Sequence, residues 1–241
     1  MAAVSVTPPE LVRITARRPS AQLQPPRDRY IRMRPLALAL LHTLYRRRCS
    51  ACALPLYTDE SLFCAGCGQS LCPSLAPGAA FAYGGALREA LLRCKVGGRA
   101  DIGQALGQLL ARSWSKRHPQ PEVLLPVPLH PARLRQRGFN QSLLLAVPLA
   151  RRLARPCRPS WLRRVRATQP QAACDGAPAR WHNVAGSFQA HPVVRGRHIL
   201  LIDDIRTTGA TFAAARQSLL AAGARCVDCY ALAQAGASAL P

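Results

Sequence analysis

The feature of this chain that most restricts its fold is an apolar segment that runs directly into two acids. Residues 199–202 are an unbroken apolar run, and Asp203 and Asp204 follow it. Such a run is typical of a buried strand in a parallel sheet, and two carboxylates inside it would carry a large desolvation cost. We therefore expect the strand to end at Ile202 and the acids to emerge at its carboxyl end, where open parallel sheets bind ligands.

A hydroxyl-rich turn, a helix and a second strand complete this unit. Residues 207–211 read T-T-G-A-T, an Ala-rich helical pattern follows as far as Gly223, and residues 226–233 are again apolar. This order predicts a β-α-β unit. Gly209 permits a tight turn, and the unpaired backbone N–H groups that open the helix attract a phosphate.

The acids and the turn are suited to the two ends of one ligand. Carboxylates accept hydrogen bonds from vicinal hydroxyls or face a hydrated Mg²⁺, and the hydroxyls and N–H groups of the turn bind phosphate. A ribose 5-phosphate satisfies both ends. The candidate ligand-binding residues are Asp203, Asp204, Arg206, Thr207, Thr208, Gly209, Ala210 and Thr211. The alternative is that the acids only end a strand and the threonines only cap a helix. The chain contains no G-x-x-x-x-G-K-[ST] motif, and no G-x-G-x-x-G stands at this junction.

Four of the ten cysteines form two C-x-x-C pairs with eleven residues between the pairs, namely Cys49, Cys52, Cys64 and Cys67. Four thiolates close the coordination sphere of a tetrahedral Zn²⁺, so the two pairs predict a structural zinc module. A redox dithiol is the alternative for either pair alone, and Cys72 is a spare sulfur that could replace one ligand. The scattered cysteines, Cys226 among them, are expected to be small buried hydrophobes.

The chain is strongly basic, with 33 basic and 11 acidic residues and a net charge of +22. All of the basic residues except Lys95 and Lys116 are arginine. A basic chain is typical of proteins that bind nucleic acid. Arginine enrichment is also what a GC-rich coding sequence produces, so the charge alone leaves polyanion binding open.

Two basic segments are candidates for holding a pyrophosphate or another polyanion. Phe81–Gly98 is predicted to be a strand and then a helix that carries Lys95. A second predicted strand, Val123–Leu129, is followed by a basic loop and by a helix that reaches Leu153. That loop contains Arg133, Arg135 and Arg137, and arginine matches phosphate oxygens bidentately. A solvated basic loop is the alternative.

The stretch from Arg164 to Phe188 is irregular and interrupted by glycine and proline. Long irregular stretches inside a compact domain are either functional or disordered. We expect a mobile lid that carries Gln169, Arg180 and Asn183, and an ordinary surface excursion is the alternative.

The chain is predicted to have three parts. Residues 1–32 are rich in proline and arginine without apolar periodicity, so we expect them to be disordered, and Met33 could be the true start. Residues 33–79 are expected to form a helix, at residues 36–44, and the zinc module. Residues 80–241 are expected to form the ligand-binding α/β domain. No segment reaches the length of a membrane span, and we expect the protein to be cytoplasmic.

Taken in order, five motifs resemble the ComF family of competence-associated, phosphoribosyltransferase-like proteins. They are the two cysteine pairs, K-x-G-G, V-P-L-H-P with R-x-R-G-F-N-Q-S, T-Q with R-x-x-N-V-x-G-x-F, and L-L-I-D-D-I-R-T-T-G-A-T. The resemblance covers about Arg34–Ala233. The one departure is minor, because Leu125-Pro126 stands where the family has V-P.

The resemblance implies a type I phosphoribosyltransferase fold with a small N-terminal zinc module held by four cysteines. It also implies that residues 203–211 bind phosphoribosyl pyrophosphate (PRPP) with Mg²⁺, that Asp203 and Asp204 hold the ribose, and that the protein is linked to DNA uptake or use. Two functions stay open at this point. One is phosphoribosyl transfer to an unidentified acceptor. The other is a non-catalytic accessory of DNA uptake that binds single-stranded DNA and DNA-uptake proteins.

Overall fold

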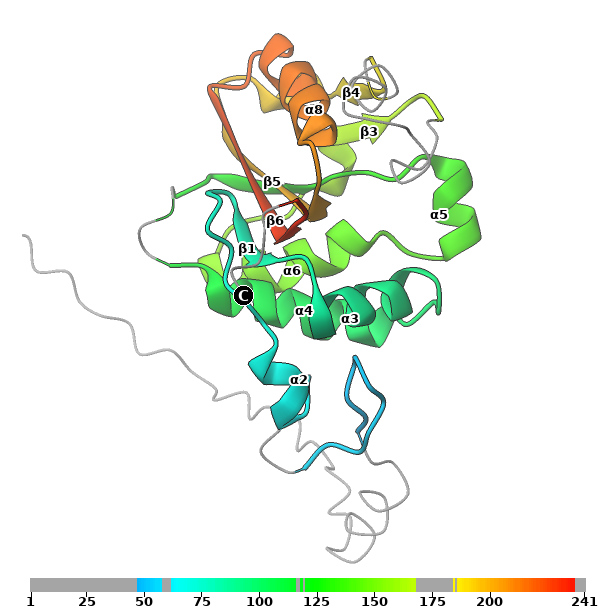
Figure 1. The fold of residues 1–241 in the computed structure, drawn as a ribbon. Helices are drawn as coiled ribbons and strands as arrows, with labels where there is room; N and C mark the ends of the chain where they lie inside the picture. The colour runs from blue at the N-terminus through cyan, green and yellow to red at the C-terminus, as the bar shows by residue number, and fades with distance from the viewer. Residues whose placement is uncertain are drawn as a thin grey trace, which may run out of the picture. The chain divides into compact units, whose positions relative to one another are not determined.

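A parallel sheet of four strands forms the centre of the protein (Figure 1). The strands are β1 (Ala79–Ala82), β2 (Val123–Pro126), β5 (His198–Arg206) and β6 (Cys226–Gln234). Their order across the sheet is β1-β6-β5-β2, and each neighbouring pair is parallel. The predicted apolar strand 199–202 is thus a central strand, and all four of its residues are buried.

The computed structural model describes residues 47–57, 62–115, 118, 120–167, 184 and 186–236. These residues all belong to one unit that spans Tyr45–Pro241. The helix expected at residues 36–44 and the segment before it lie outside the described residues, as do the three candidate lid residues, Gln169, Arg180 and Asn183.

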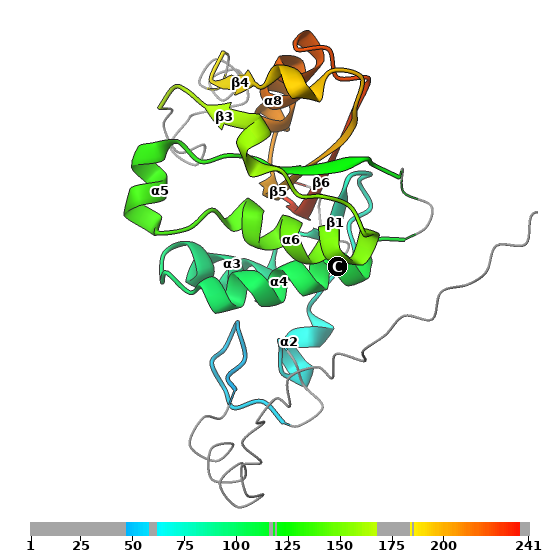
Figure 2. The ribbon, with the colours of Figure 1, turned by 180° about the vertical axis from the view of Figure 1, so that it is seen from behind.

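Helices cover both faces of the sheet, because side chains alternate along each strand. On β5, Leu200 and Ile202 face one apolar cluster, and Ile199 and Leu201 face another. The first cluster is completed by α3 (Gly85–Lys95), α4 (Ala100–Ser113) and α6 (Gln141–Leu153). The second is completed by α8 (Ala210–Ala221). Figures 1 and 2 show the three helices on one side of the sheet and α8 on the other.

An antiparallel pair of short strands, β3 (Leu162–Arg164) and β4 (Phe188–Ala190), flanks the stretch in which a lid was predicted. Single turns of 3-10 helix adjoin both strands, at Pro159–Trp161 and Pro192–Val194. Leu162 and Phe188 are buried in the same apolar cluster as α8, so the two ends of the stretch are anchored to the core.

The strand that carries the acids is longer than predicted. We expected β5 to end at Ile202, but its pairing with β6 continues to Arg206, which lies opposite Gln234. On its other side, β5 pairs with β2 only as far as Ile202, opposite Pro126. The backbone of the acid segment is therefore satisfied from one side by β6. The absence of β2 beside it leaves room for the two carboxylates.

A helix also stands where a basic loop was predicted. Helix α5 covers Pro131–Arg137, and β2 is shorter than the predicted Val123–Leu129. The local sequence carries the signals of a short helix. His130 Nδ1 accepts a hydrogen bond from the N–H of Ala132, a proline opens the helix, and Gly138 ends it with a φ of 80°. A seven-residue helix is too short for apolar periodicity to reveal it.

Candidate functional site

A cavity of about 490 Å³ lies at the carboxyl ends of β2 and β5. The end of α3, the start of α6 and the turn before α8 also contribute to it. Four basic and two acidic side chains line the cavity, so its charge suits an anionic ligand. Its polar and charged lining includes Lys95, Arg133, Arg137, Gln141, Ser142, Arg164, Asp203, Asp204, Thr207 and Thr211.

Asp203 is held by two hydrogen bonds at one oxygen. Its Oδ1 accepts from Ser142 Oγ at 2.8 Å and from the backbone N–H of Asp204 at 2.9 Å. Burial, together with the adjacent Asp204 carboxylate, raises the pKa of Asp203 from 3.8 to about 7 despite these hydrogen bonds. Asp203 therefore changes its charge near neutral pH, which is unusual for an aspartate.

Asp204 forms an ion pair with Lys95, whose Nζ lies 2.7 Å from Asp204 Oδ2. The other oxygen, Oδ1, accepts from the N–H of Ile205 at 2.7 Å. Burial alone would lower the pKa of Lys95, but the Asp204 carboxylate outweighs this effect and raises it. Lys95 was predicted to be a pyrophosphate ligand. The fold brings it next to Asp204, which lies 109 positions later in the chain.

The three predicted arginines of the basic segment do not act as one group. Arg133 and Arg137 lie one turn apart on α5, so they share a face, and both line the cavity. Arg135 lies between them on the opposite side of the helix and is exposed. The formation of α5 therefore separates Arg135 from Arg133 and Arg137.

The turn that precedes α8 has the backbone expected of it. Gly209 has a φ of 80° and occupies the position before the helix, and Thr208 Oγ1 accepts from the N–H of Ala210 at 3.4 Å. Thr207 and Thr211 line the cavity. Arg206 does not line it, because its Nε donates to Gln234 Oε1 on the neighbouring strand.

Gln141, Ser142 and Arg164 are among the cavity residues that were not predicted as site residues. Gln141 is only 3% exposed, and its Nε2 has no hydrogen-bond partner among the described residues. An unsatisfied buried amide costs about 1–3 kcal/mol, so this donor favours a ligand that can accept from it. The sequence did contain a signal, because Asn140 caps α6 and places the next two residues in its first turn.

The two cysteine pairs meet in space. The sulfurs of Cys49, Cys52, Cys64 and Cys67 all lie within 4.8 Å of one another, and Cys52 Sγ is 3.7 Å from Cys64 Sγ. Four thiolates around a tetrahedral Zn²⁺ lie about 3.8 Å apart, given Zn–S bonds of roughly 2.3 Å. The cluster therefore fits such an ion. Cys72 is exposed and is not part of the cluster.

The cysteine cluster is attached to the sheet domain through α3. Arg93 Nη1 lies 3.2 Å from the carbonyl oxygen of Cys49, 3.5 Å from that of Ser50 and 3.3 Å from that of Ala51. Cys49 itself is buried in the apolar cluster that contains α3. Two residues after Arg93, the same helix carries Lys95, so a single helix contacts both the cysteine cluster and the cavity.

One expectation about the other cysteines was wrong. Cys226 is exposed rather than buried, because it is the first residue of β6 and lies where that strand begins. It lies near His198 and Asp228, whose side chains form a pair with His198 Nε2 2.6 Å from Asp228 Oδ2.

Comparisons with known proteins agree with this architecture. A sequence profile described as "Phosphoribosyl transferase domain" matches residues 140–241. The "DNA utilization protein YhgH" of Escherichia coli strain K12 is 34% identical over 190 residues, which cover 76% of this chain and 82% of that protein. The chain belongs to the ComF family. "Competence protein ComFC" of Bacillus subtilis strain 168 is 33% identical over 144 residues, which cover 59% of this chain and 57% of that protein.

Solved phosphoribosyltransferase structures are also partly similar. The glutamine PRPP amidotransferase from B. subtilis has a TM-score of 0.36 at 22% identity, over 54% of this chain and 25% of its own. The purine phosphoribosyltransferase from Pyrococcus horikoshii has a TM-score of 0.33 at 18% identity, over 59% of this chain and 79% of its own. This ComF protein has a type I phosphoribosyltransferase fold, a parallel sheet with flanking helices, as the resemblance implied. No helix within the described part of the chain combines the length and the apolar character needed to cross a bilayer.

Proposed function

We propose that the 490 Å³ cavity binds PRPP together with Mg²⁺, and that the four clustered cysteines hold one structural Zn²⁺. The observation that carries the first proposal is the convergence of a carboxylate pair, a hydroxyl-rich turn and four basic side chains on one cavity. A ribose with phosphates at two positions needs all three groups.

Each part of PRPP has a proposed partner in the cavity or in the turn beside it, to which Thr207 and Thr211 contribute lining side chains. Asp203 and Asp204 accept hydrogen bonds from the ribose hydroxyls. The turn at residues 207–211 and the first N–H groups of α8 take the 5-phosphate. Lys95, Arg133 and Arg137 take the pyrophosphate, whose charge Mg²⁺ neutralises when it is bound.

The buried amide of Gln141 supports ligand binding at this place independently of the acids. Its Nε2 is a donor without a partner among the described residues, and it lies in the first turn of α6. A phosphate or ribose oxygen satisfies such donors. The unpaired amide therefore favours an oxygen-rich ligand over an apolar one.

Isothermal titration with Mg²⁺-PRPP tests this proposal. The double variant Asp203→Asn/Asp204→Asn should weaken binding at least about tenfold, because neutral amides accept ribose hydroxyls less strongly than carboxylates. It should leave the circular dichroism spectrum unchanged, since neither residue packs in the core. Asp101→Asn is the matched control, because Asp101 is an exposed acid on α4 outside the cavity. Unchanged PRPP affinity in the double variant contradicts the site assignment.

A second candidate function is binding of single-stranded DNA by the arginines of α5, namely Arg133, Arg135 and Arg137. Arg135 is exposed, which favours this function. The two relatives described above are named a DNA utilization protein and a competence protein, which also favours it. The same titration with a single-stranded oligonucleotide separates the two functions. Binding through phosphate contacts weakens steeply with salt and is lost in the triple alanine variant at Arg133, Arg135 and Arg137. Replacement of the two acids leaves DNA binding intact.

The function that we propose is binding of PRPP, and catalytic turnover is a separate step with its own test. In a transferase, the bond from C1 of the ribose to the pyrophosphate oxygen breaks, and an acceptor nucleophile forms the new bond to C1. In this proposal, Arg164 and the pyrophosphate-binding residues stabilise the departing charge. Release of pyrophosphate that depends on an acceptor, and is lost in Asp204→Asn, would establish the enzyme.

A further inference from the structure

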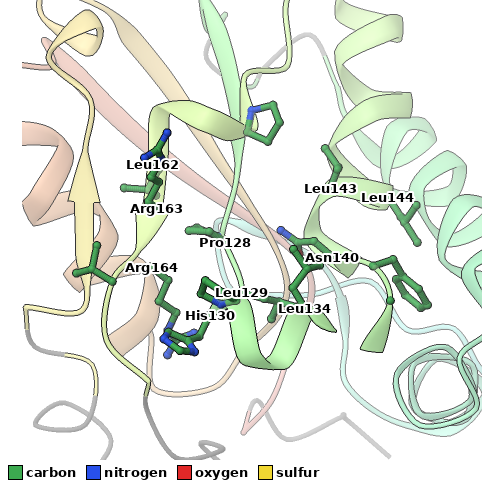
Figure 3. A pocket seen from close by; sticks show the side chains of 15 residues that line it. Pro128, Leu129, His130, Leu134, Asn140, Leu143, Leu144, Leu162, Arg163 and Arg164 are labelled. Carbon is green, nitrogen blue, oxygen red and sulfur yellow. The ribbon is translucent and has the colours of Figure 1, made fainter. Parts of the chain in front are cut away.

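A second and larger cavity, of about 720 Å³, lies beside the first. The two cavities share three lining residues, Pro128, Leu129 and Arg164. These residues form a common wall in the segment after β2 and at the end of β3. In Figure 3, Pro128 and Leu129 lie between the β3 residues on one side and Leu134 and Leu143 on the other.

The walls of this cavity are mainly apolar. Ten of its fifteen lining residues are proline, leucine, valine or phenylalanine. Four of these residues carry rings, Pro128, Pro131, Pro159 and Phe139, and the aromatic ring of Phe139 can pair with another planar ring. The volume lies in the range of 300–1,000 Å³ that is typical of small-molecule sites.

The polar groups of the cavity carry positive charge or donate hydrogen bonds. Arg163 and Arg164 contribute guanidinium groups from β3, and none of the fifteen lining residues is an acid. His130 uses Nδ1 to cap α5, which leaves Nε2 for another partner. Asn140 is already bonded, to the carbonyl of Val127 and to the N–H of Ser142. A cationic ligand would find no counter-charge among these lining residues, whereas an anionic one would.

We propose that this cavity is the binding site of a second small molecule, a planar aromatic anion. Its ring packs against the apolar walls, and its negatively charged group meets the guanidinium of Arg163. Arg164, the next residue of β3, extends to the opposite side of the strand (Figure 3). The identification of this molecule as a partner of PRPP rests on the proposed function, because only the common wall links the two cavities. Occupancy of the cavity does not depend on that function.

Three probes of one shape and different charge test the proposal: benzoate, benzamide and benzamidinium. Their binding to the full chain is followed by ligand-observed saturation-transfer NMR, with dissociation constants obtained by titration. Benzoate should bind most tightly and benzamidinium most weakly, with at least about a tenfold difference between them because the charge contact reverses sign. Benzamidinium binding as tight as that of benzoate overturns the proposal.

A variant that fills the cavity locates the binding. Leu134 lies on α5 in the cavity wall and is 42% exposed, so Leu134→Trp fills the cavity without disrupting the core. The matched control is Val193→Trp, because Val193 is 41% exposed and lies outside the cavity. Leu134→Trp should weaken benzoate at least about tenfold and the control should not. Equal benzoate affinity in the two variants overturns the proposal.

The charged group has its own test. Arg163→Gln should reduce the preference for benzoate over benzamide, whereas Arg152→Gln, at the end of α6 and outside both cavities, should not. Mg²⁺-PRPP titrated into Leu134→Trp should bind as it does to the parent, because Leu134 does not line the first cavity. Failure of PRPP to bind the parent contradicts the proposed function alone. Failure of the benzoate series contradicts this inference alone.

Discussion

The cysteine cluster and the 490 Å³ cavity contact the same helix but are built in opposite ways. The cluster consists of four side chains from two short turns and the five-residue helix α2 (Ala65–Gln69). The cavity lies at the ends of strands and helices that are anchored in the core, among them β5, α3 and α6. We infer that the cysteine cluster depends on its bound metal ion to fold. The cavity needs its ligands only to function.

The largest effect should follow from breaking the cluster. Cys64→Ser removes one of four thiolates, and structural zinc contributes roughly 10–16 kcal/mol to the folding of small zinc peptides. We expect the variant to lose its zinc and the region around residues 47–72 to become sensitive to protease. Elemental analysis and limited proteolysis measure the two effects.

Cys72→Ser is the control for this variant, because Cys72 is an exposed cysteine close in sequence but outside the cluster. It should keep both zinc and protease resistance. A parent protein that contains well under one zinc per chain when freshly purified, or a Cys64→Ser protein that keeps its full zinc content, would contradict the prediction.

Breaking the contact between α3 and the cysteine cluster should have a smaller effect on stability. Arg93→Ala removes the guanidinium that contacts three carbonyl oxygens of the first cysteine turn. Hydrogen bonds to a charged group contribute about 1.5–3 kcal/mol, so the free energy of unfolding should fall by about that amount. Loss of zinc to a chelator should also become faster.

PRPP affinity should change little in Arg93→Ala, because the buried residues of α3, among them Leu87 and Leu91, hold the helix in place. Arg88→Ala, which alters an exposed arginine of the same helix, serves as the control. A parallel loss of PRPP binding and zinc retention would show that the two regions are coupled more tightly than the comparison implies.

The effect expected from the cavity depends on pH. The pKa of Asp203 is raised from 3.8 to about 7, so the folded protein keeps a proton that the unfolded chain releases. The parent therefore loses stability as the pH rises from about 4 to about 7. Asp203→Asn should match the parent near pH 4 and exceed it by roughly 4 kcal/mol at pH 8, because each unit of pKa shift corresponds to about 1.4 kcal/mol. Chemical unfolding at each pH measures the difference.

Asp101 is the control for the pH effect, because its pKa is shifted in the opposite direction. The hydrogen bond from Arg99 lowers the pKa of Asp101, so Asp101→Asn should give no gain in stability at high pH. A stability difference between Asp203→Asn and the parent that stays constant from pH 4 to pH 8 would mean that Asp203 titrates normally.

Much of the fold follows from local patterns in the chain. The apolar run before Asp203 predicts a buried strand, the T-T-G-A-T turn predicts the start of a helix, and both are found. The spacing of the cysteines predicts that four sulfurs meet, and they do. These predictions succeed because periodicity, glycine conformation and short spacings act over a few residues.

The site contains details that no local pattern carries. Arg133 and Arg137 line the cavity and Arg135 does not, because a short helix replaces the expected loop. Arg206 is held by Gln234 because β5 continues its pairing with β6 beyond the acids.

The sequence by itself determined the residue types of the site, the four cysteine positions and the strand, turn, helix and strand between residues 199 and 233. Only the tertiary structure decided that Lys95 pairs with Asp204, that Gln141 is buried without a partner among the described residues, and that an apolar cavity adjoins the polar one. The physical reason is that these features depend on how α3, α5 and α6 pack against the sheet. Packing is set by contacts between residues far apart in the chain, and the sequence around each residue does not encode them.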